Sequence, residues 1–396
     1  MPNNPFSGNL LRNFTVEFLD ATLSDFWNTS KEYRSIKNKM FEDNSFHTIT
    51  KILESKAGEN VDKQKLDAIL FNDLAWVVPD NHFIYLFDTP DDIVKIKDAI
   101  NGKTNSLDRP IHHSSLDKEA FQLVSMRQEN NSLVLLFRNG YTKDEDTKKT
   151  IFFIACEYNF TKKTFIIKIR ENFRQNAQKK RRELISEIFT FIKDLTPTIT
   201  YIRKTKKEIK DQIYKLFKNE TEKAESIIKS KLPLKEQILD KEIEEFNMHK
   251  LKLVSPETLE SNNKIIKYMY FQNIAQNLEL GNFSDRYIFA FSFHDGNTTR
   301  SVTRDSLRKH IYSKKLYWNL KSLVTEKTKV DEISIYYRIN KKNYKLPPLR
   351  SNFTGLEVTI KEFHGSFMID YYNNKRRDFE RKMKSEFVLY ELEEYL

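Results

Sequence analysis

The sequence is poor in cysteine and contains no long apolar run. Cys156 is the only cysteine among 396 residues, so the chain has no disulfide framework and no cysteine-rich zinc site of its own. No stretch of about 18 apolar residues occurs, and the first residues, MPNNPFSGNLLRNF, lack the basic and apolar regions of a secretory signal. We therefore expect a cytoplasmic protein that does not enter a membrane.

Glycine is also scarce, and its spacing excludes several classes of enzyme. No two of the eight glycines are close enough to form GxGxxG, GxxxxGK or GxSxG. The positions are Gly8, Gly58, Gly102, Gly140, Gly281, Gly296, Gly355 and Gly365. The sequence therefore disfavours a P-loop NTPase, a Rossmann dehydrogenase and an α/β-hydrolase, and we expect no cofactor.

Metal-binding and catalytic patterns are equally sparse. No two of the eight histidines have the HxxxH spacing of a helical metal site, and His294-Asp295 is expected at a strand end. A nuclease of the restriction type carries Glu-x-Lys on a strand that helps to hold Mg²⁺. The three triplets with this spacing fall in predicted helices and begin at Glu54, Glu208 and Glu380. We therefore expect no metal site, and a divergent metal-dependent nuclease stays an alternative.

The composition indicates a folded protein of mixed architecture. Hydrophobic residues make up 39% of the chain and charged residues 31%, and the length suggests two or three domains. We expect a mainly helical region over 1–110, a β-meander with a basic helix over 111–200, a charged helical arm over 201–255 and an α+β domain over 256–396. The predicted fold class is α+β, with antiparallel sheets and ββα-like units.

The N-terminal region contains a segment whose order of elements is that of a winged helix. Residues 46–87 are predicted to form two short helices followed by strands over 75–78 and 83–87. The second helix carries charges of both signs, which does not favour DNA reading, so a winged helix stays one possibility. Another helix is predicted between a Thr89 cap and a stop at Gly102.

The next region has the alternation and turn residues of an antiparallel meander. Strands are predicted over 120–126, 132–138, 149–157 and 163–169, with a turn at Asn139-Gly140. Cys156 lies in the most apolar of these strands, which indicates a buried structural thiol. A helix of about 20 residues is predicted to follow, from Gln175 to Asp194.

Two strands followed by a basic helix recur along the chain. The pattern is predicted at 151–194, 286–324 and 355–395, and KRREL at 180–184 is echoed by KRRDF at 375–379. An internal duplication is one interpretation, although ββα is a common unit.

The charged arm has a different character. Residues 203–250 keep an apolar stripe at helical spacing that Pro233 interrupts, so a helical hairpin or arm and a partner-binding coiled coil are both open interpretations. An interaction scaffold that binds an acidic protein through this arm is therefore a second alternative. The helix that opens at Ser255 is predicted to carry Ile265, Ile266, Met269 and Leu278.

The strongest functional signal is a concentration of positive charge near the middle of the chain. Residues 161–210 contain 15 Lys and Arg against 5 Asp and Glu, an excess of ten, whereas the net charge of the whole chain is +11. Such cations bind phosphates with salt-dependent affinity that is independent of base sequence. The candidate nucleic-acid-binding residues are Arg170, Arg174, Lys179, Lys180, Arg181, Arg182, Arg203, Lys204, Lys206 and Lys207.

We therefore expect a protein that binds DNA or RNA, and a binding protein rather than an enzyme. A solvated helix face is the alternative explanation of the basic cluster. The lysine-rich, motif-poor character is similar to that of accessory proteins from bacterial defence or mobile-element loci. That resemblance implies a subunit of a larger complex.

Overall fold

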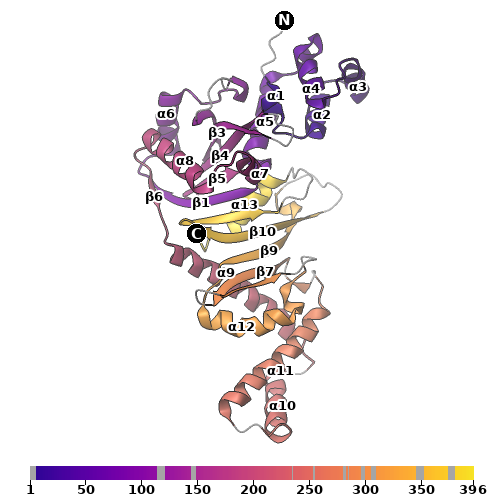
Figure 1. The fold of residues 1–396 in the computed structure, drawn as a ribbon, viewed down its shortest axis with the longest axis vertical. Coiled ribbons are helices and arrows are strands. Elements are labelled where there is room, and N and C mark those ends of the chain that lie inside the picture. Colours follow the sequence, from indigo (N-terminus) through magenta and orange to yellow (C-terminus); the bar gives the residue numbers. More distant parts are fainter. Residues whose placement is uncertain are drawn as a thin grey trace. The chain divides into compact units, whose positions relative to one another are not determined.

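The computed structural model describes most of the chain and divides it into two compact units. It describes residues 6–113, 121–143, 149–233, 235–252, 255–279, 282–283, 285–295, 299–304, 309–344, 352–372 and 380–396. The first unit comprises Met1–Arg203 with Asn373–Val388, and the second Lys204–Tyr372 with Leu389–Leu396. Each contains helices and antiparallel strands (Figure 1), so the predicted α+β class is confirmed. Within the described ranges, no helix has the length and apolar character needed to cross a bilayer.

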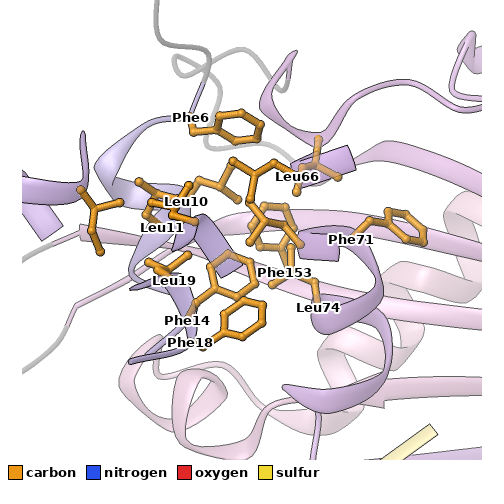
Figure 2. Packing of buried hydrophobic residues seen from close by; sticks show 14 of the residues in the cluster. Phe6, Leu10, Leu11, Phe14, Phe18, Leu19, Leu66, Phe71, Leu74 and Phe153 are labelled. Atoms are coloured by element: carbon orange, nitrogen blue, oxygen red, sulfur yellow. The ribbon is translucent and has the colours of Figure 1, made fainter. Parts of the chain in front are cut away.

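The first unit begins with short helices that polar residues start. Its helices are α1 Gly8–Leu11, α2 Val16–Ser24, α3 Ser30–Lys39, α4 Ser45–Glu54, α5 Lys63–Asn72, α6 Ile93–Thr104, α7 Glu171–Asn176 and α8 Arg181–Leu195. The helices α1 to α5 are capped in turn by the side chains of Ser7, Thr15, Thr29, Asn44 and Asp62. Each such cap stabilises its helix by about 1 kcal/mol. The apolar sides of these helices meet in a core that includes Phe14, Leu19 and Phe71 (Figure 2).

The strands of the first unit form an antiparallel sheet, and the predicted meander is confirmed. The order is β2-β3-β4-β5-β1, and the short β6 also pairs with β1. The bounds are β1 Asn81–Asp88, β2 Phe121–Glu129, β3 Ser132–Lys143, β4 Lys149–Asn159, β5 Thr164–Ile169 and β6 Thr200–Ile202. The predicted turn at Asn139-Gly140 is wrong, because β3 continues through both residues with a bulge between Arg138 and Tyr141. Gly140 has a φ of 68° there, a conformation that glycine adopts without strain.

Helices cover both faces of this sheet, which explains why β4 is apolar along nearly its whole length. On one face, Phe153 packs against the N-terminal helices (Figure 2), and Ala155 belongs to the same buried cluster. On the other face, the ring of Phe137 lies 5.6 Å from that of Phe191 in α8. A strand buried on both sides needs no polar alternation. Cys156 is fully buried in β4, as predicted, and burial raises the pKa of its thiol.

The winged-helix interpretation is wrong. The predicted strand over 75–78 belongs instead to a π-helical turn, Asp73–Val77, that continues α5, and the Val78 amide donates to the Asp73 carbonyl at 2.9 Å. Trp76 is buried in that turn. The short apolar run over 75–78 therefore lies in the core, and such a run has the composition of a buried strand or of a buried helix. The second predicted strand, β1, pairs with β5 rather than closing a hairpin.

The bounds of α6 also differ from the prediction. Asp92, not Thr89, accepts the capping hydrogen bond, from the Lys95 amide. The helix passes through Gly102 and ends at Asn105, whose φ of 47° lies in the left-handed region. An asparagine in that conformation ends a helix as glycine does.

The second unit combines long helices with antiparallel strands. Its strands follow the order β8-β7-β9-β10-β11. Their bounds are β7 Arg286–Asp295, β8 Thr299–Arg304, β9 Glu332–Asn340, β10 Phe353–Phe363 and β11 Ser366–Tyr371. The helices are α9 Lys206–Ser230, α10 Glu236–His249, α11 Pro256–Gln276 and α12 Lys315–Lys327, while α13 Arg381–Glu391 crosses from the first unit to the second.

The charged arm is helical and broken near Pro233, as predicted, but its hairpin differs. α10 packs along α11 and not back along α9, and the two helices extend side by side away from β7 and β9 (Figure 1). The helix that ends the pattern predicted at 286–324 begins at Lys315, after a 3₁₀ turn at Ile311–Ser313. The echo at 375–379 and the start of the predicted last helix lie outside the described residues.

Candidate nucleic-acid interface

The basic helix predicted from Gln175 to Asp194 is interrupted. α7 ends at Asn176 and α8 begins at Arg181, and between them Gln178 has a φ of 55°. The four consecutive cations therefore lie on both sides of the break between α7 and α8, and they do not form the first half of a single helix. Lys179 and Lys180 lie in the link, and only Arg181 and Arg182 belong to α8.

One carboxylate at the start of α7 holds two of the predicted phosphate-binding arginines. Glu171 accepts hydrogen bonds from Arg174 at 2.6 and 2.9 Å and from Arg181 at 3.1 Å. Arg181 also donates to the Asn81 side chain at 3.2 Å, which ties α8 to β1. Burial acts to raise the pKa of Glu171, but the bonds from the two guanidiniums outweigh it and hold that pKa below its usual value. Arg174 and Arg181 thus stabilise the break.

Two further predicted cations are also directed into the first unit. Arg170 donates to the Asn13 carbonyl at 3.1 Å, and its guanidinium lies 3.8 Å from the centre of the Phe173 ring. Burial lowers the pKa of Arg170 to about 10. Lys179 donates to the side chain of Asn139, which is itself buried in β3. These contacts give both side chains a structural role.

The second predicted group of cations is divided between the two units. Arg203 ends the first unit and Lys204 begins the second. Lys204 donates to the carbonyl of Leu396 within its own unit, and burial lowers its pKa. Lys206 and Lys207 are exposed in the first turn of α9. The ten predicted residues therefore do not form a single surface in either unit.

A smaller basic face remains on α8, formed by Arg182 and Lys193 together with Arg203 from beyond β6. Arg182, Phe189 and Lys193 share one side of the helix because they are spaced at i, i+7 and i+11. Arg203 reaches the same place, with its guanidinium 5.9 Å from the centre of the Phe189 ring. All three cations are exposed, and none has an acidic partner among the described residues. We call this surface the basic face of α8.

The neighbouring side of α8 is acidic, so charge is segregated on the helix. Glu183, Glu187 and Asp194 recur at i, i+4 and i+11 and line a shallow groove of about 760 Å³ beside Phe121 and Phe191. Lys180, the remaining predicted cation, lies 3.3 Å from Glu183 in an exposed ion pair, which is worth little in water. A polyanion is therefore attracted to one side of α8 and repelled from the other.

Lys193 was not among the predicted site residues, although the sequence contained a signal for it. Once α8 is taken to begin at Arg181, Lys193 lies three turns after Arg182 on the same side. Charge density alone pointed to the consecutive run at Lys179–Arg182 instead. Helical phase groups Lys193 with Arg182 only once the position of the break between α7 and α8 is known.

The residues considered for nuclease chemistry have other roles. Glu208 closes a capping box with Thr205, and Lys382 pairs with Glu129. His294 contacts Asp331 rather than its neighbour Asp295. Within the described part of the chain, no three His, Cys, Asp or Glu side chains come together as a metal site would require.

No protein-family model, curated protein or solved structure matches this chain. The function is therefore argued from the residues alone. In chemical terms, the basic face of α8 offers exposed cations beside a partly exposed aromatic ring, a combination that can hold a phosphate backbone and stack a base.

Proposed function

We propose that this protein binds nucleic acid through the basic face of α8, without reading the base sequence. The observation that carries the proposal is the position of Arg203 against Phe189, with Arg182 and Lys193 on the same side of the helix. Ion pairing does not explain these three cations, whereas it does explain Arg174 and Arg181. A partly exposed ring beneath a guanidinium favours a single strand, whose bases are free to stack.

The surface is small, so the expected affinity is modest and strongly dependent on salt. Each phosphate contact to a single strand contributes a slope of about −0.7 in log K against log salt. Three cations account for a slope of about −2 in log K against log salt. Such a weak contact suits a subunit that contributes part of the nucleic-acid affinity of a larger assembly, such as a defence or mobile-element complex. The RNA or DNA identity of the strand is open to the test below.

The proposal is tested by titrating labelled single-stranded RNA, single-stranded DNA and duplex DNA at two salt concentrations. The variant combines Arg182→Ala, Lys193→Ala and Arg203→Ala. We expect weaker binding, and a salt slope shallower by about 2 if all three side chains contact phosphate. Fluorescence anisotropy measures both quantities.

A matched control removes the same charge from another helix of the same unit. Lys31, Arg34 and Lys39 are exposed on α3, and the triple alanine variant is expected to bind like the wild type. Equal losses in the two variants would mean that net charge and not the basic face of α8 drives binding. Failure of the wild type to bind at low salt would overturn the proposed function.

A further inference from the structure

A row of aromatic rings crosses the face of the first unit's sheet on which α8 packs. Its members are Tyr158 in β4, Phe165 in β5, Tyr85 and Phe87 in β1, and Tyr201 in β6. Each ring is brought beside the next by strand pairing or by the alternation within β1. The ring of Phe189 in α8 lies 4.9 Å from that of Tyr85 and 4.7 Å from that of Tyr201. Phe189 therefore joins this aromatic row to the basic face of α8.

The other end of the aromatic row lies at the turn between β4 and β5. The ring of Phe160, in that turn, lies 5.5 Å from the ring of Phe87 and is partly exposed. The ammonium of Lys163 lies 5.8 Å from the centre of the Phe87 ring, and this side chain is exposed. Within the described part of the chain, Lys163 has no acidic partner. An exposed cation near a partly exposed ring thus occurs at both ends of the row.

Hydrogen bonds fix the turn that carries Phe160 and Lys163. The Phe160 amide donates to the Asn131 carbonyl at 3.0 Å, and the Asn131 side chain donates to the Thr161 hydroxyl at 2.9 Å. The Phe87 amide donates to the Lys163 carbonyl, also at 3.0 Å. The backbone of the turn is therefore in place before a ligand arrives, and binding there costs little further ordering.

Asp88 follows Phe87 in β1, but it does not neutralise this surface. Successive side chains of a strand point to opposite faces, so Asp88 lies on the face away from the aromatic row. Its carboxylate accepts a hydrogen bond from the Thr89 amide at 2.9 Å. The cations at the two ends of the row are therefore available to a polyanion.

We propose that a single strand bound on the basic face of α8 continues along the aromatic row to a second subsite, formed by Phe160 and Lys163. The inference rests on the proposed function, because it extends the path of the same strand. Phe160 stacks on one base and Lys163 contacts a phosphate, while the partly exposed Tyr201 lies between the two subsites. Rings that stack on bases, with cations beside them, bind single strands of any sequence. A duplex offers a phosphate to Lys163 but no free base to Phe160.

The dependence of binding on strand length tests the second subsite. The probes are labelled oligothymidylates of about 4 and about 16 nucleotides, which span the usual site sizes for single strands. The variant combines Phe160→Leu, which keeps an apolar side chain without a ring, with Lys163→Gln. We expect it to bind the long strand roughly tenfold more weakly, because a base stack and a phosphate contact are lost. It is expected to bind the short strand, which the basic face of α8 holds by itself, as the wild type does.

A matched control makes the same two changes elsewhere in the first unit. Phe41 is 69% exposed and Lys56 is exposed, so Phe41→Leu with Lys56→Gln removes a surface ring and a surface charge. This variant is expected to bind both strands as the wild type does. An equal loss in the control would show that the substitutions act through net charge or surface composition.

The outcomes separate the second subsite from the proposed function. Unchanged binding of the long strand by the Phe160 and Lys163 variant, with binding still dependent on Arg182, Lys193 and Arg203, would overturn the second subsite alone. Equal losses for the short and long strands would also overturn it, because the changes would then act on the basic face of α8. A wild type that binds neither strand removes both proposals.

A tryptophan at position 160 reports stacking directly. Phe160→Trp keeps an aromatic ring in the turn, and the three native tryptophans are at most 7% exposed, so their emission is a constant background. The long strand is expected to quench the fluorescence of the new indole, and the short strand is expected to quench it much less. Binding of the long strand without quenching would show that no base stacks at this position.

Discussion

Lys168 and Glu157 form an ion pair in the interior of the first unit, with 2.9 Å between Nζ and Oε2 and almost no solvent access to either side chain. They lie on the neighbouring strands β5 and β4, where Lys168 is paired with Ala155, two residues before Glu157 on the same face. The ammonium also lies 3.0 Å from the centre of the Trp76 ring. Burial lowers the pKa of Lys168, and Glu157 opposes that shift.

Removing one member of this pair is expected to be far more damaging than replacing both. Glu157→Gln leaves the lysine buried without its counter-charge and is expected to lower the free energy of unfolding by about 3–5 kcal/mol. The double variant Glu157→Leu with Lys168→Met is expected to recover most of that loss. Urea unfolding followed by tryptophan fluorescence measures the difference, and a change below about 1 kcal/mol for Glu157→Gln would contradict the reasoning.

His82 lies on the same face, and its burial makes the stability of the first unit sensitive to acid. Burial lowers the pKa of His82 well below 6.5, and Lys168 and Arg381 lower it further. The unfolded chain therefore takes up a proton near pH 6.5 that the folded chain does not. Acid favours the unfolded state, so stability falls as the pH drops through that value.

The size of this effect follows from one proton. Below about pH 6.5, His82 contributes a loss approaching 1.4 kcal/mol per pH unit. His82→Gln removes that contribution, so the variant is expected to lose less stability than the wild type between pH 7 and pH 5. Urea unfolding at several pH values measures the two slopes, and parallel slopes would show that His82 accepts a proton in the folded state.

The Glu171 carboxylate is expected to matter for stability out of proportion to its place near the surface. Glu171→Gln weakens the bonds from Arg174 and Arg181 and is expected to lower the free energy of unfolding by roughly 1–2 kcal/mol. Glu183→Gln makes the same change in charge but disturbs only the exposed pair with Lys180, so it is expected to have an effect within about 0.5 kcal/mol. Equal effects from the two variants would contradict the assigned role of Glu171.

The sequence predicted most strands because strand signals are local. Alternation, turn residues and the apolar run of β4 located β2, β3, β4 and β5 to within a few residues. The strand predicted over 75–78 is a helical turn, because four apolar residues suit a buried strand or a buried helical turn equally well. The tertiary contacts of Trp76 decide between them.

The candidate site was harder to predict, because charge counts ignore pairing. Residues 161–210 carry an excess of ten positive charges, yet Lys168 and Arg174 pair with acids and Arg170 is directed inward. Which cations pair depends on where the chain turns at Gln178. The sequence around the turn, Asn-Ala-Gln-Lys, contains neither glycine nor proline and gives no strong turn signal.

Two glycines of the first unit are expected to respond in opposite directions to the same substitution. A Cβ on Gly58 would lie 2.3 Å from the Leu53 carbonyl oxygen, a backbone atom at the end of α4. The 3₁₀ turn at Lys56–Asn60 must therefore shift, and Gly58→Ala is expected to destabilise the protein by about 2 kcal/mol or more.

Gly102 lies inside α6 with nothing within 4 Å of the added carbon. Gly102→Ala is expected to stabilise by about 0.5–1 kcal/mol, because alanine loses less backbone entropy in a helix. Thermal unfolding of the two variants checks both signs at once, and a Gly58→Ala protein as stable as the wild type would show that the turn is free to move.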